Sequence, residues 1–549
     1  MVKSLIAAAL VVATSLIPIK DLSSAPLTAA NNDDLQHANY APTGWPAKSL
    51  PEIAEAIAAG EASSEEVVQA FLTRIAMIDR SGPTLRSIIS VNPDALDEAK
   101  RLDRMMARGE VMGPLHGVPV LLKDNIESLD AMPTTAGSLA LVDNVTGRDS
   151  PLVAGLRAVG AIILGKTNLS QWANFRSEDS MSGWSSLGGQ VQNPHALDRN
   201  PCGSSSGSGA AAAASLAAGT VGTETNGSVI CPSNANGIVG FKPTVGLVSG
   251  QYIVPISSSQ DTAGPMTKTV KGAAMMLTAM ATAENRQDYV VGLSADYLAG
   301  KKIGVMAFAR GGNHDIHLLF DAAVEKLKAL GAEIVVIEER PDAPDNFWPS
   351  ARAVLDFEFK ATLNDYLAST PSTVKARTLA DLIRFNEENA AIEMPLFDQS
   401  IFLGAEEKGD LTTPDYIEAR DLVQKATREE GIDKLLAEND VDMLLAPSGP
   451  VVPRIDAANG DVWPSFPGVG WMAAIAGYPH GTVPMGTVHG LPVGLSFMAG
   501  KDSDAEVLAA MYAFEQATMA RAEPTYIPSI DVRPEVADGV KGHLFKGNE

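Results

Sequence analysis

The chain has 549 residues, enough for a large buried core and more than one structural unit. Apolar residues make up 45% of it and charged residues 20%, a balance typical of globular proteins. The formal net charge of -24 argues against nucleic-acid binding and against docking on an anionic membrane, because both need clustered Lys and Arg.

The N-terminus has the pattern of an export signal. Lys3 precedes an apolar run at residues 5–19 that is short for a stable membrane span. Small residues at 28–30 offer a cleavage site, so we expect residues 1–30 to be a signal peptide and the protein to be periplasmic or secreted. An uncleaved anchor and a misassigned start codon are the alternatives. Residues 31–45 are polar and are interpreted as a linker.

The first part of the chain predicts helices and short buried strands. Residues 63–80 predict an amphipathic helix that begins with a capping box, and residues 93–109 predict a second helix. Residues 118–122 form an apolar run typical of a buried strand, with Lys123 at its carboxyl end, where ligands bind in α/β sheets. A helix, a glycine turn and another buried strand follow over residues 150–164.

The second half alternates in the same way. Residues 301–338 predict a strand, a helix and a strand, a βαβ-like unit. Residues 340–435 are mostly amphipathic and predict a helical cap or insertion, and two further buried strands lie within residues 440–450 and 490–500. Residues 504–522 predict a closing helix. This alternation indicates an α/β fold with a sheet covered by helices.

The two cysteines are too few for a disulfide framework. Cys202 and Cys231 flank a stretch rich in Gly and Ser, and they are able to pair in an oxidising compartment. One pair adds little to a protein of this size, so we expect two small buried thiols instead.

The Gly- and Ser-rich stretch, residues 200–244, departs most from average composition. It suits a backbone that turns sharply and brings amide N–H groups and hydroxyls close to a ligand. A P-loop needs a lysine that is missing here, and GSGAAA matches a dinucleotide fingerprint poorly. GSSSG at residues 203–207 formally fits the nucleophile elbow of an α/β-hydrolase, but no histidine stands in a distinctive context. His314 and His317 form only a weak metal pair and are interpreted as surface residues.

A serine activated through a second serine and a lysine fits better. Burial lowers the pKa of a lysine, and a neutral lysine is a competent base. A hydroxyl of the Gly/Ser cluster can then relay a proton from the nucleophile to Lys123. TETNGS at residues 223–228 supplies another hydroxyl, and Gly227 allows a tight turn whose amides point at a developing oxyanion.

Three segments resemble the motifs of the amidase signature family and occur in the same order along the chain: GVPVLLKDNI, CGSSSGSGAA and GTETNGSVICPSNANGIVGFKPT. The resemblance extends over about residues 46–525. It implies the amidase-signature fold, a central mixed β-sheet with helices on both faces, here in one domain over residues 46–530 followed by a tail at 531–549. It also implies an amide hydrolase that needs no metal or organic cofactor.

The resemblance carries the family's catalytic roles onto this sequence. Lys123 matches the base, Ser204 the bridging serine and Ser228 the nucleophile. A cis peptide bond is expected between Gly203 and Ser204, and Ser205 matches a serine that helps to hold the lysine.

The matching oxyanion-hole donors are backbone N–H groups of four consecutive residues, Thr225, Asn226, Gly227 and Ser228. Three positions depart from the common motif, since Cys202, Asn226 and Ile230 stand where Gly, Gly and Arg are usual. The three catalytic positions are intact.

Three segments are similar to those of the bacterial peptide-amidase branch: TETNGS with the VICP that follows it, KTNLSQWANFR, and VPISSSQDTAGPM. Enzymes of that branch release ammonia from C-terminally amidated peptides. The expected substrate is therefore a small amide or a peptide amide. The alternatives are an aryl-acylamide or fatty-acid amide hydrolase, the glutaminase subunit of a tRNA-dependent amidotransferase, and a binding protein that has lost catalysis. No nucleic-acid partner is expected, and the mature form is not expected to be embedded in a membrane.

Overall fold

The computed structural model of the chain describes residues 40–541. The predicted signal peptide lies outside this range, as do most of the predicted linker and the end of the predicted tail. The packed region already includes Tyr40, whose ring lies edge-on to Tyr526 with 5.7 Å between ring centroids. Within residues 40–541, no helix is both long enough and apolar enough to cross a bilayer.

An eleven-stranded mixed sheet forms the centre of residues 40–541, with the strand order β1-β3-β2-β6-β8-β7-β12-β13-β11-β9-β10. Parallel pairs join β2 to β3 and β6, and β9 to β10 and β11. The strands are β1 (Ile88–Val91), β2 (Pro119–Lys123), β3 (Ile162–Thr167), β6 (Gly219–Glu224), β7 (Val239–Lys242), β8 (Thr262–Thr267), β9 (Lys302–Met306), β10 (Glu333–Ile337), β11 (Met443–Pro447), β12 (His480–Val488) and β13 (Leu491–Met498), and a separate ribbon pairs β4 (Trp184–Ser185) with β5 (Gly189–Gln190).

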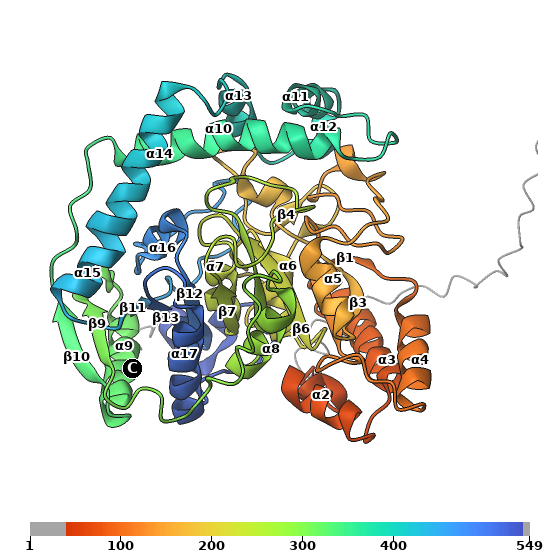
Figure 1. Cartoon of the computed structure of the whole chain (residues 1–549), viewed down its shortest axis with the longest axis horizontal. Helices are drawn as coiled ribbons and strands as arrows, with labels where there is room; N and C mark the ends of the chain where they lie inside the picture. Colours follow the sequence, from red (N-terminus) through yellow and green to blue (C-terminus); the bar gives the residue numbers. More distant parts are fainter. Residues whose placement is uncertain (1–39, 542–549) are drawn as a thin grey trace, which may run out of the picture. The chain divides into compact units, whose positions relative to one another are not determined.

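Helices cover both faces of this sheet, as expected for the amidase-signature fold (Figure 1). The helices that precede the predicted insertion at residues 340–435 are α2 (Leu50–Ala58), α3 (Ser64–Arg74), α4 (Ala95–Met106), α5 (Pro151–Ala158), α6 (Ser206–Ala213), α7 (Ile230–Asn236), α8 (Val270–Met280) and α9 (His314–Ala329). Those after it are α16 (Gly470–Ala476), α17 (Asp504–Thr518) and α18 (Pro534–Lys541). The helix predicted at 63–80 is present in two parts, since α3 ends at Arg74 and a π-helical segment continues it over Ile75–Asp79.

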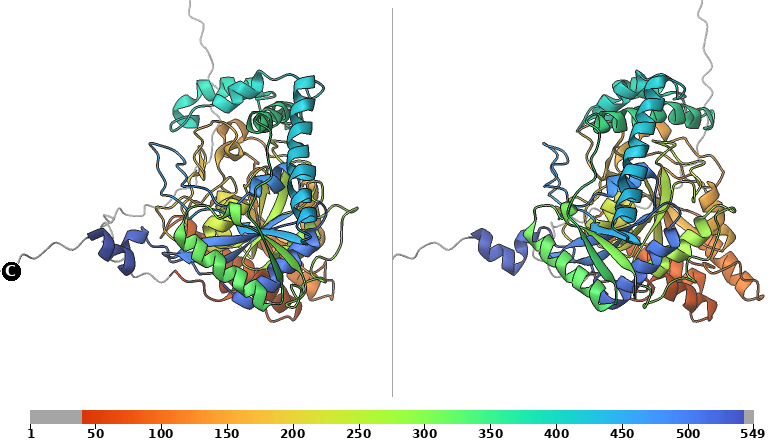
Figure 2. Two further views of the ribbon diagram at one scale, coloured as in Figure 1. Left: turned by 90° about the vertical axis from the view of Figure 1, so that its left-hand side faces the viewer. Right: turned by 60° about the vertical axis from the view of Figure 1, so that its left-hand side comes forward.

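The segment predicted to be a helical insertion is helical and comprises α10 (Phe347–Ala368), α11 (Leu379–Glu388), α12 (Ala390–Glu393), α13 (Ser400–Glu406), α14 (Pro414–Thr427) and α15 (Asp433–Glu438). Helices α10 to α13 lie together above the sheet, and α14 runs down beside it to α15 (Figures 1 and 2). Aromatic pairs anchor the insertion: Phe359 of α10 lies 4.9 Å from Phe175, and Phe402 of α13 lies 5.6 Å from Trp172, both measured between ring centroids. Residues 172–175 adjoin the candidate site, so the insertion packs against the wall of that site.

The apolar runs predicted as buried strands are strands, but β6 corrects the sequence analysis. Its sequence, GTVGTE, lies inside the Gly- and Ser-rich stretch, whose composition indicates a sharply turning backbone, yet β6 is fully buried near the middle of the sheet. Its glycines are needed for close packing. A Cβ at Gly222 would lie 2.8 Å from the Ser205 hydroxyl, and one at Gly219 would lie 2.5 Å from the sulfur of Met276. Neighbouring atoms thus occupy the space that larger strand residues would fill.

Candidate active site

Strand β2 delivers Lys123 to the edge of the sheet where β6 also ends. The two strands are parallel neighbours, so their carboxyl ends lie side by side. Lys123 is fully buried. Its Nζ donates to the Ser204 hydroxyl at 2.7 Å, to the Thr223 hydroxyl at 2.9 Å and to the Thr223 carbonyl at 3.3 Å. The structure therefore brings the predicted base against the predicted bridging serine, residues far apart in the sequence.

Burial lowers the pKa of Lys123 to about 7, because desolvation disfavours the ammonium form. The negative charges of Asp261 and Glu224 act in the opposite direction and raise this pKa. The amine is therefore poised to exchange a proton near neutral pH, as a general base requires.

The turn that carries Ser204 packs closely against Ser170. The peptide bond between Gly203 and Ser204 is cis, as expected. A Cβ at Gly203 would lie 2.2 Å from the Ser170 hydroxyl, so a larger residue there would have to displace the Ser170 side chain. The Ser204 carbonyl accepts a hydrogen bond from the Ser170 amide at 3.1 Å, and α6 begins two residues later. These contacts fix the Ser204 side chain against Lys123.

Ser205 acts on the lysine through Thr223. Its hydroxyl donates to the Thr223 carbonyl at 3.0 Å and accepts from the Thr223 amide at 3.1 Å. Within residues 40–541 it makes no hydrogen bond to Lys123 itself. The sequence analysis did not name Thr223, although this residue begins the TETNGS motif and accepts two of the lysine's hydrogen bonds.

The turn after β6 holds Ser228 beside this cluster. Gly227 has φ +84°, a conformation that favours glycine, and the Ser228 carbonyl accepts from the Ser205 amide at 3.2 Å. The buried Glu224 carboxylate accepts from the amides of Val229 and Ile230 at 2.8 and 3.0 Å, which shapes the turn from the inside.

The outer side of this turn is left open. Among the described residues, none accepts a hydrogen bond from the amides of Asn226, Gly227 and Ser228. Ser228 is partly exposed, and its hydroxyl makes no hydrogen bond to any described residue. Unsatisfied amides beside an accessible hydroxyl form an arrangement that can receive a carbonyl oxygen.

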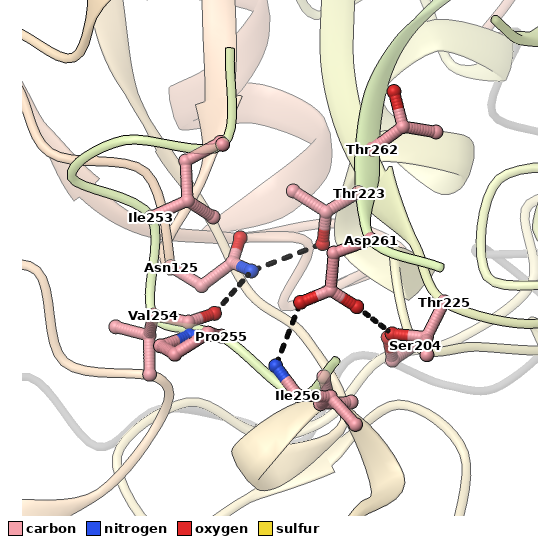
Figure 3. Close-up of a pocket in the computed structure, with 12 residues that line it drawn as sticks. Asn125, Ser204, Thr223, Thr225, Ile253, Val254, Pro255, Ile256, Asp261 and Thr262 are labelled. Atoms are coloured by element: carbon pink, nitrogen blue, oxygen red, sulfur yellow. Dashed lines mark hydrogen bonds between the residues drawn. The ribbon is translucent and has the colours of Figure 1, made fainter. Parts of the chain in front are cut away.

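Two cavities of very different size lie on either side of the cis turn. The inner cavity has a volume of about 30 Å³, room for one or two water molecules, and Ser204 lies in its wall. In Figure 3 the side chains of Asn125, Thr223 and Asp261 point into the same hollow. The cleft on the other side has a volume of about 650 Å³. Its walls include Gly203, Asn226 and Gly227 beside the cis turn, and the aromatic rings of Phe308, Trp348, Trp463, Phe466 and Trp471.

Asp261 is the main site residue that the sequence motifs did not reveal. Its carboxylate accepts from the Thr225 hydroxyl at 2.6 Å and from the amides of Ile256 and Ser257 at 2.7 and 3.0 Å. Asp261 therefore joins the first residue of the Ser228 turn to the loop that closes the inner cavity. It stands in the VPISSSQDTAGPM segment, the only sequence signal that could have pointed to it.

The expectation of two free thiols is wrong, because Cys202 and Cys231 form a disulfide with 5.8 Å between their Cα atoms. One cysteine precedes the cis turn, and the other lies in the first turn of α7, just after Ser228. The fold brings these segments together, and the bond links them across the side of the large cleft.

We expect removal of this disulfide to lower stability. Its cysteines are 29 residues apart, and closing a loop of that length in the unfolded chain corresponds to about 3–4 kcal/mol. The double variant Cys202→Ala/Cys231→Ala should have a smaller free energy of unfolding than the wild type in urea titrations. A reductant should lower the melting temperature of the wild type but leave that of the double variant unchanged. An equal response of both proteins would contradict this account.

The predicted surface histidines lie at the start of α9, outside the candidate site. His314 is exposed, and His317 contacts the Gly311 carbonyl at 3.0 Å. Within residues 40–541 no cluster of three or more metal-ligating side chains is present.

Comparison with known proteins defines the class. The amidase family model matches residues 66–508. The crystal structure of the native peptide amidase from Stenotrophomonas maltophilia is similar, with a TM-score of 0.83 and 42% identity over 88% of this chain and 100% of that one. A probable amidase of Arabidopsis thaliana is 35% identical over 85% of this chain and 89% of its own length. A glutamyl-tRNA(Gln) amidotransferase subunit of Methylococcus capsulatus is 33% identical over 86% of this chain and 97% of its own length.

The chain therefore belongs to the amidase signature family and is a hydrolase that acts on amide bonds. Its solved relatives include peptide amidases at 42–44% identity, consistent with the branch that the sequence motifs indicated.

Proposed function

We propose that this protein hydrolyses the C-terminal carboxamide of amidated peptides and releases ammonia, with Ser228 as nucleophile, Ser204 as bridging serine and Lys123 as base. The observation that carries the proposal is the 2.7 Å contact between a buried lysine and Ser204, on a turn bonded to that of Ser228. The peptide amidase relatives support the choice of substrate.

In the proposed first step, neutral Lys123 takes the proton of Ser204, which takes that of Ser228. The Ser228 oxygen bonds to the carbonyl carbon, and the open amides of the turn stabilise the negative oxygen that forms. The carbon–nitrogen bond then breaks, and the proton returns from Lys123 through Ser204 to the leaving nitrogen. Water hydrolyses the acyl-enzyme by the same relay, which releases the acid and frees Ser228.

The sizes of the two cavities favour a primary amide over an anilide. Ser204 lies in the wall of the inner cavity, so the leaving nitrogen must reach that side to receive its proton. A volume of about 30 Å³ accepts an amino group but not an aromatic ring. The cleft of about 650 Å³ can take a peptide as the acyl part, and its aromatic walls provide apolar contact.

This account predicts a strong preference for small leaving groups. With an N-blocked dipeptide as the common acyl part, the wild type should release ammonia from the amide with kcat/KM at least about 100-fold higher than it releases aniline from the anilide, because a pocket without room rejects the larger group. Both products are measured directly, ammonia by a coupled assay and aniline by chromatography. Similar values for the two substrates would instead support an aryl-acylamide hydrolase.

We also propose that the mature protein works outside the cytoplasm. The export pattern of the first 30 residues and the Cys202–Cys231 disulfide both support this location, since disulfides persist in oxidising compartments. Fractionation of the native host, with detection of the protein in the periplasm or medium, tests it.

A further inference from the structure

A third cavity adjoins the inner cavity on the side opposite the large cleft. This outer cavity has a volume of about 490 Å³. It shares four wall residues with the inner cavity: Gly250, Ile253, Pro255 and Asp261. On the other side, the large cleft meets the inner cavity at consecutive residues, Gly203 with Ser204 and Thr225 with Asn226. The three hollows thus follow one another, with Ser204 between the cleft and the outer cavity.

The wall between the inner and outer cavities is a thin, well-anchored loop. The Val254 amide donates to the Asn125 carbonyl at 2.8 Å, and the Tyr252 carbonyl accepts from the Glu127 amide at 3.1 Å. Figure 3 shows Ile253 and Pro255 on the side of the hollow opposite Ser204. Gly250 completes the wall, is exposed, and has no atom within 4 Å of the position that a Cβ would take. The loop is therefore held in place but leaves open space at Gly250.

The outer cavity suits a small cation. Its wall residues include Asp261 and Asp365 but no lysine or arginine. The Asp261 carboxylate itself already accepts from Thr225, Ile256 and Ser257, of which the first two line the inner cavity. The Arg148 guanidinium stacks 4.0 Å above the Tyr252 ring and donates to the Ser369 hydroxyl at 3.0 Å, both in the wall, and it is paired with Glu127. A wall whose own charged residues are acidic, beside a guanidinium that is already paired with Glu127, favours an ammonium ion over an anion. The aromatic cleft on the other side offers an ammonium ion fewer charged contacts, with only Asp461 in its wall and Arg340 opposing it.

We propose that ammonia leaves through the wall at Gly250 into the outer cavity, while the acyl group remains in the large cleft. This inference rests on the proposed amide hydrolysis. Ammonia departs as the neutral molecule after receiving its proton from Ser204, and it takes up a further proton from water once it reaches the acidic outer cavity. Separate exits let the amine leave before the peptide acid does, so that water can replace it at the acyl-enzyme.

The route can be tested in reverse with hydroxylamine, a nucleophile close to ammonia in size that converts the acyl-enzyme to a hydroxamate. Gly250→Leu adds a side chain to the open space in the wall without a backbone clash. Gly292→Leu is the matched control, because Gly292 also has open space at its Cβ position and lines none of the three cavities. The second-order rate constant for hydroxamate formation and the KM for the peptide amide are measured for both variants and the wild type.

We expect Gly250→Leu to lower the rate constant for hydroxylamine at least about fivefold, because the rate of entry to an enclosed site depends on the width of its path. Its KM for the peptide amide should stay close to the wild-type value, and Gly292→Leu should match the wild type in both. An unchanged rate constant for hydroxylamine in Gly250→Leu would overturn the route, as would a parallel rise in KM. Ammonia release by the wild type from a peptide amide is measured before the variants are compared. A wild type that releases no ammonia from any peptide amide would refute the proposed function itself, so failure of the function is distinguished from failure of the route.

Discussion

Replacement of Ser228 by alanine is expected to lower kcat for a peptide amide by about 10⁴-fold or more, because the variant has no oxygen to form the acyl-enzyme. The substitution should leave the fold intact. The Ser228 hydroxyl is partly exposed and has no partner within residues 40–541, so its loss should change the free energy of unfolding by no more than about 0.5 kcal/mol. Ammonia release and thermal unfolding are measured on the same preparation.

Ser465→Ala is the matched control for this experiment. Ser465 is an exposed serine in the wall of the large cleft, but it lies away from the cis turn in the sequence and is not part of the proposed relay. It should retain activity close to that of the wild type. If Ser228→Ala kept more than roughly one-hundredth of wild-type kcat, Ser228 would not be the nucleophile.

The chemistry of the site could be predicted further from the sequence than its shape. The motifs placed Lys123 at the end of a buried strand and near Ser204, and the structure confirms both with a 2.7 Å contact. Local patterns suffice there, because a short apolar run ends at the lysine and the glycines beside Ser204 allow only a tight turn. β6 shows the limit of such patterns, since its glycines reflect neighbours distant in the sequence, such as Met276.

The features on which the proposed substrate rests depend on contacts between distant segments. Asp261 reaches the site because β8 pairs with β6, a pairing that no local pattern shows. The disulfide depends likewise on how α7 returns beside the cis turn. Cavity sizes follow from loops around residues 250–257 and 463–471, whose side chains carry no periodic signal. Motifs therefore predicted the reaction class, and only the three-dimensional structure separated a small inner cavity from a large cleft.

The proposed role of Lys123 as base predicts how the reaction depends on pH. Burial lowers the pKa of Lys123 to about 7, and only the neutral amine can accept a proton. We therefore expect kcat/KM to rise about tenfold per pH unit below the pKa and to level off above it. Asp261→Asn removes a charge that raises this pKa, so the midpoint of its profile should move to lower pH. A midpoint that moved to higher pH would contradict the assigned charge effect.

Loss of the amine should be as severe as loss of the nucleophile. Lys123→Met fills the same buried space without a base, and Lys123→Arg supplies a guanidinium that stays protonated, so both should lose about 10³-fold or more in kcat. Lys166→Met is the matched control. Lys166 is equally buried, on the neighbouring strand β3, but its amine donates to the Ile126 carbonyl at 2.5 Å and the Thr134 hydroxyl at 2.8 Å, away from Ser204.

The two lysines should therefore separate chemistry from stability. Lys166→Met leaves two buried acceptors without a donor, which costs about 1–3 kcal/mol each, so it should unfold at a lower temperature while its remaining activity keeps the wild-type pH midpoint. Lys123→Met should be inactive at every pH, even where it remains folded by circular dichroism. Activity in Lys123→Met that still rose through pH 7 would mean that another group supplies the base, and the contact between Lys123 and Ser204 would then be structural.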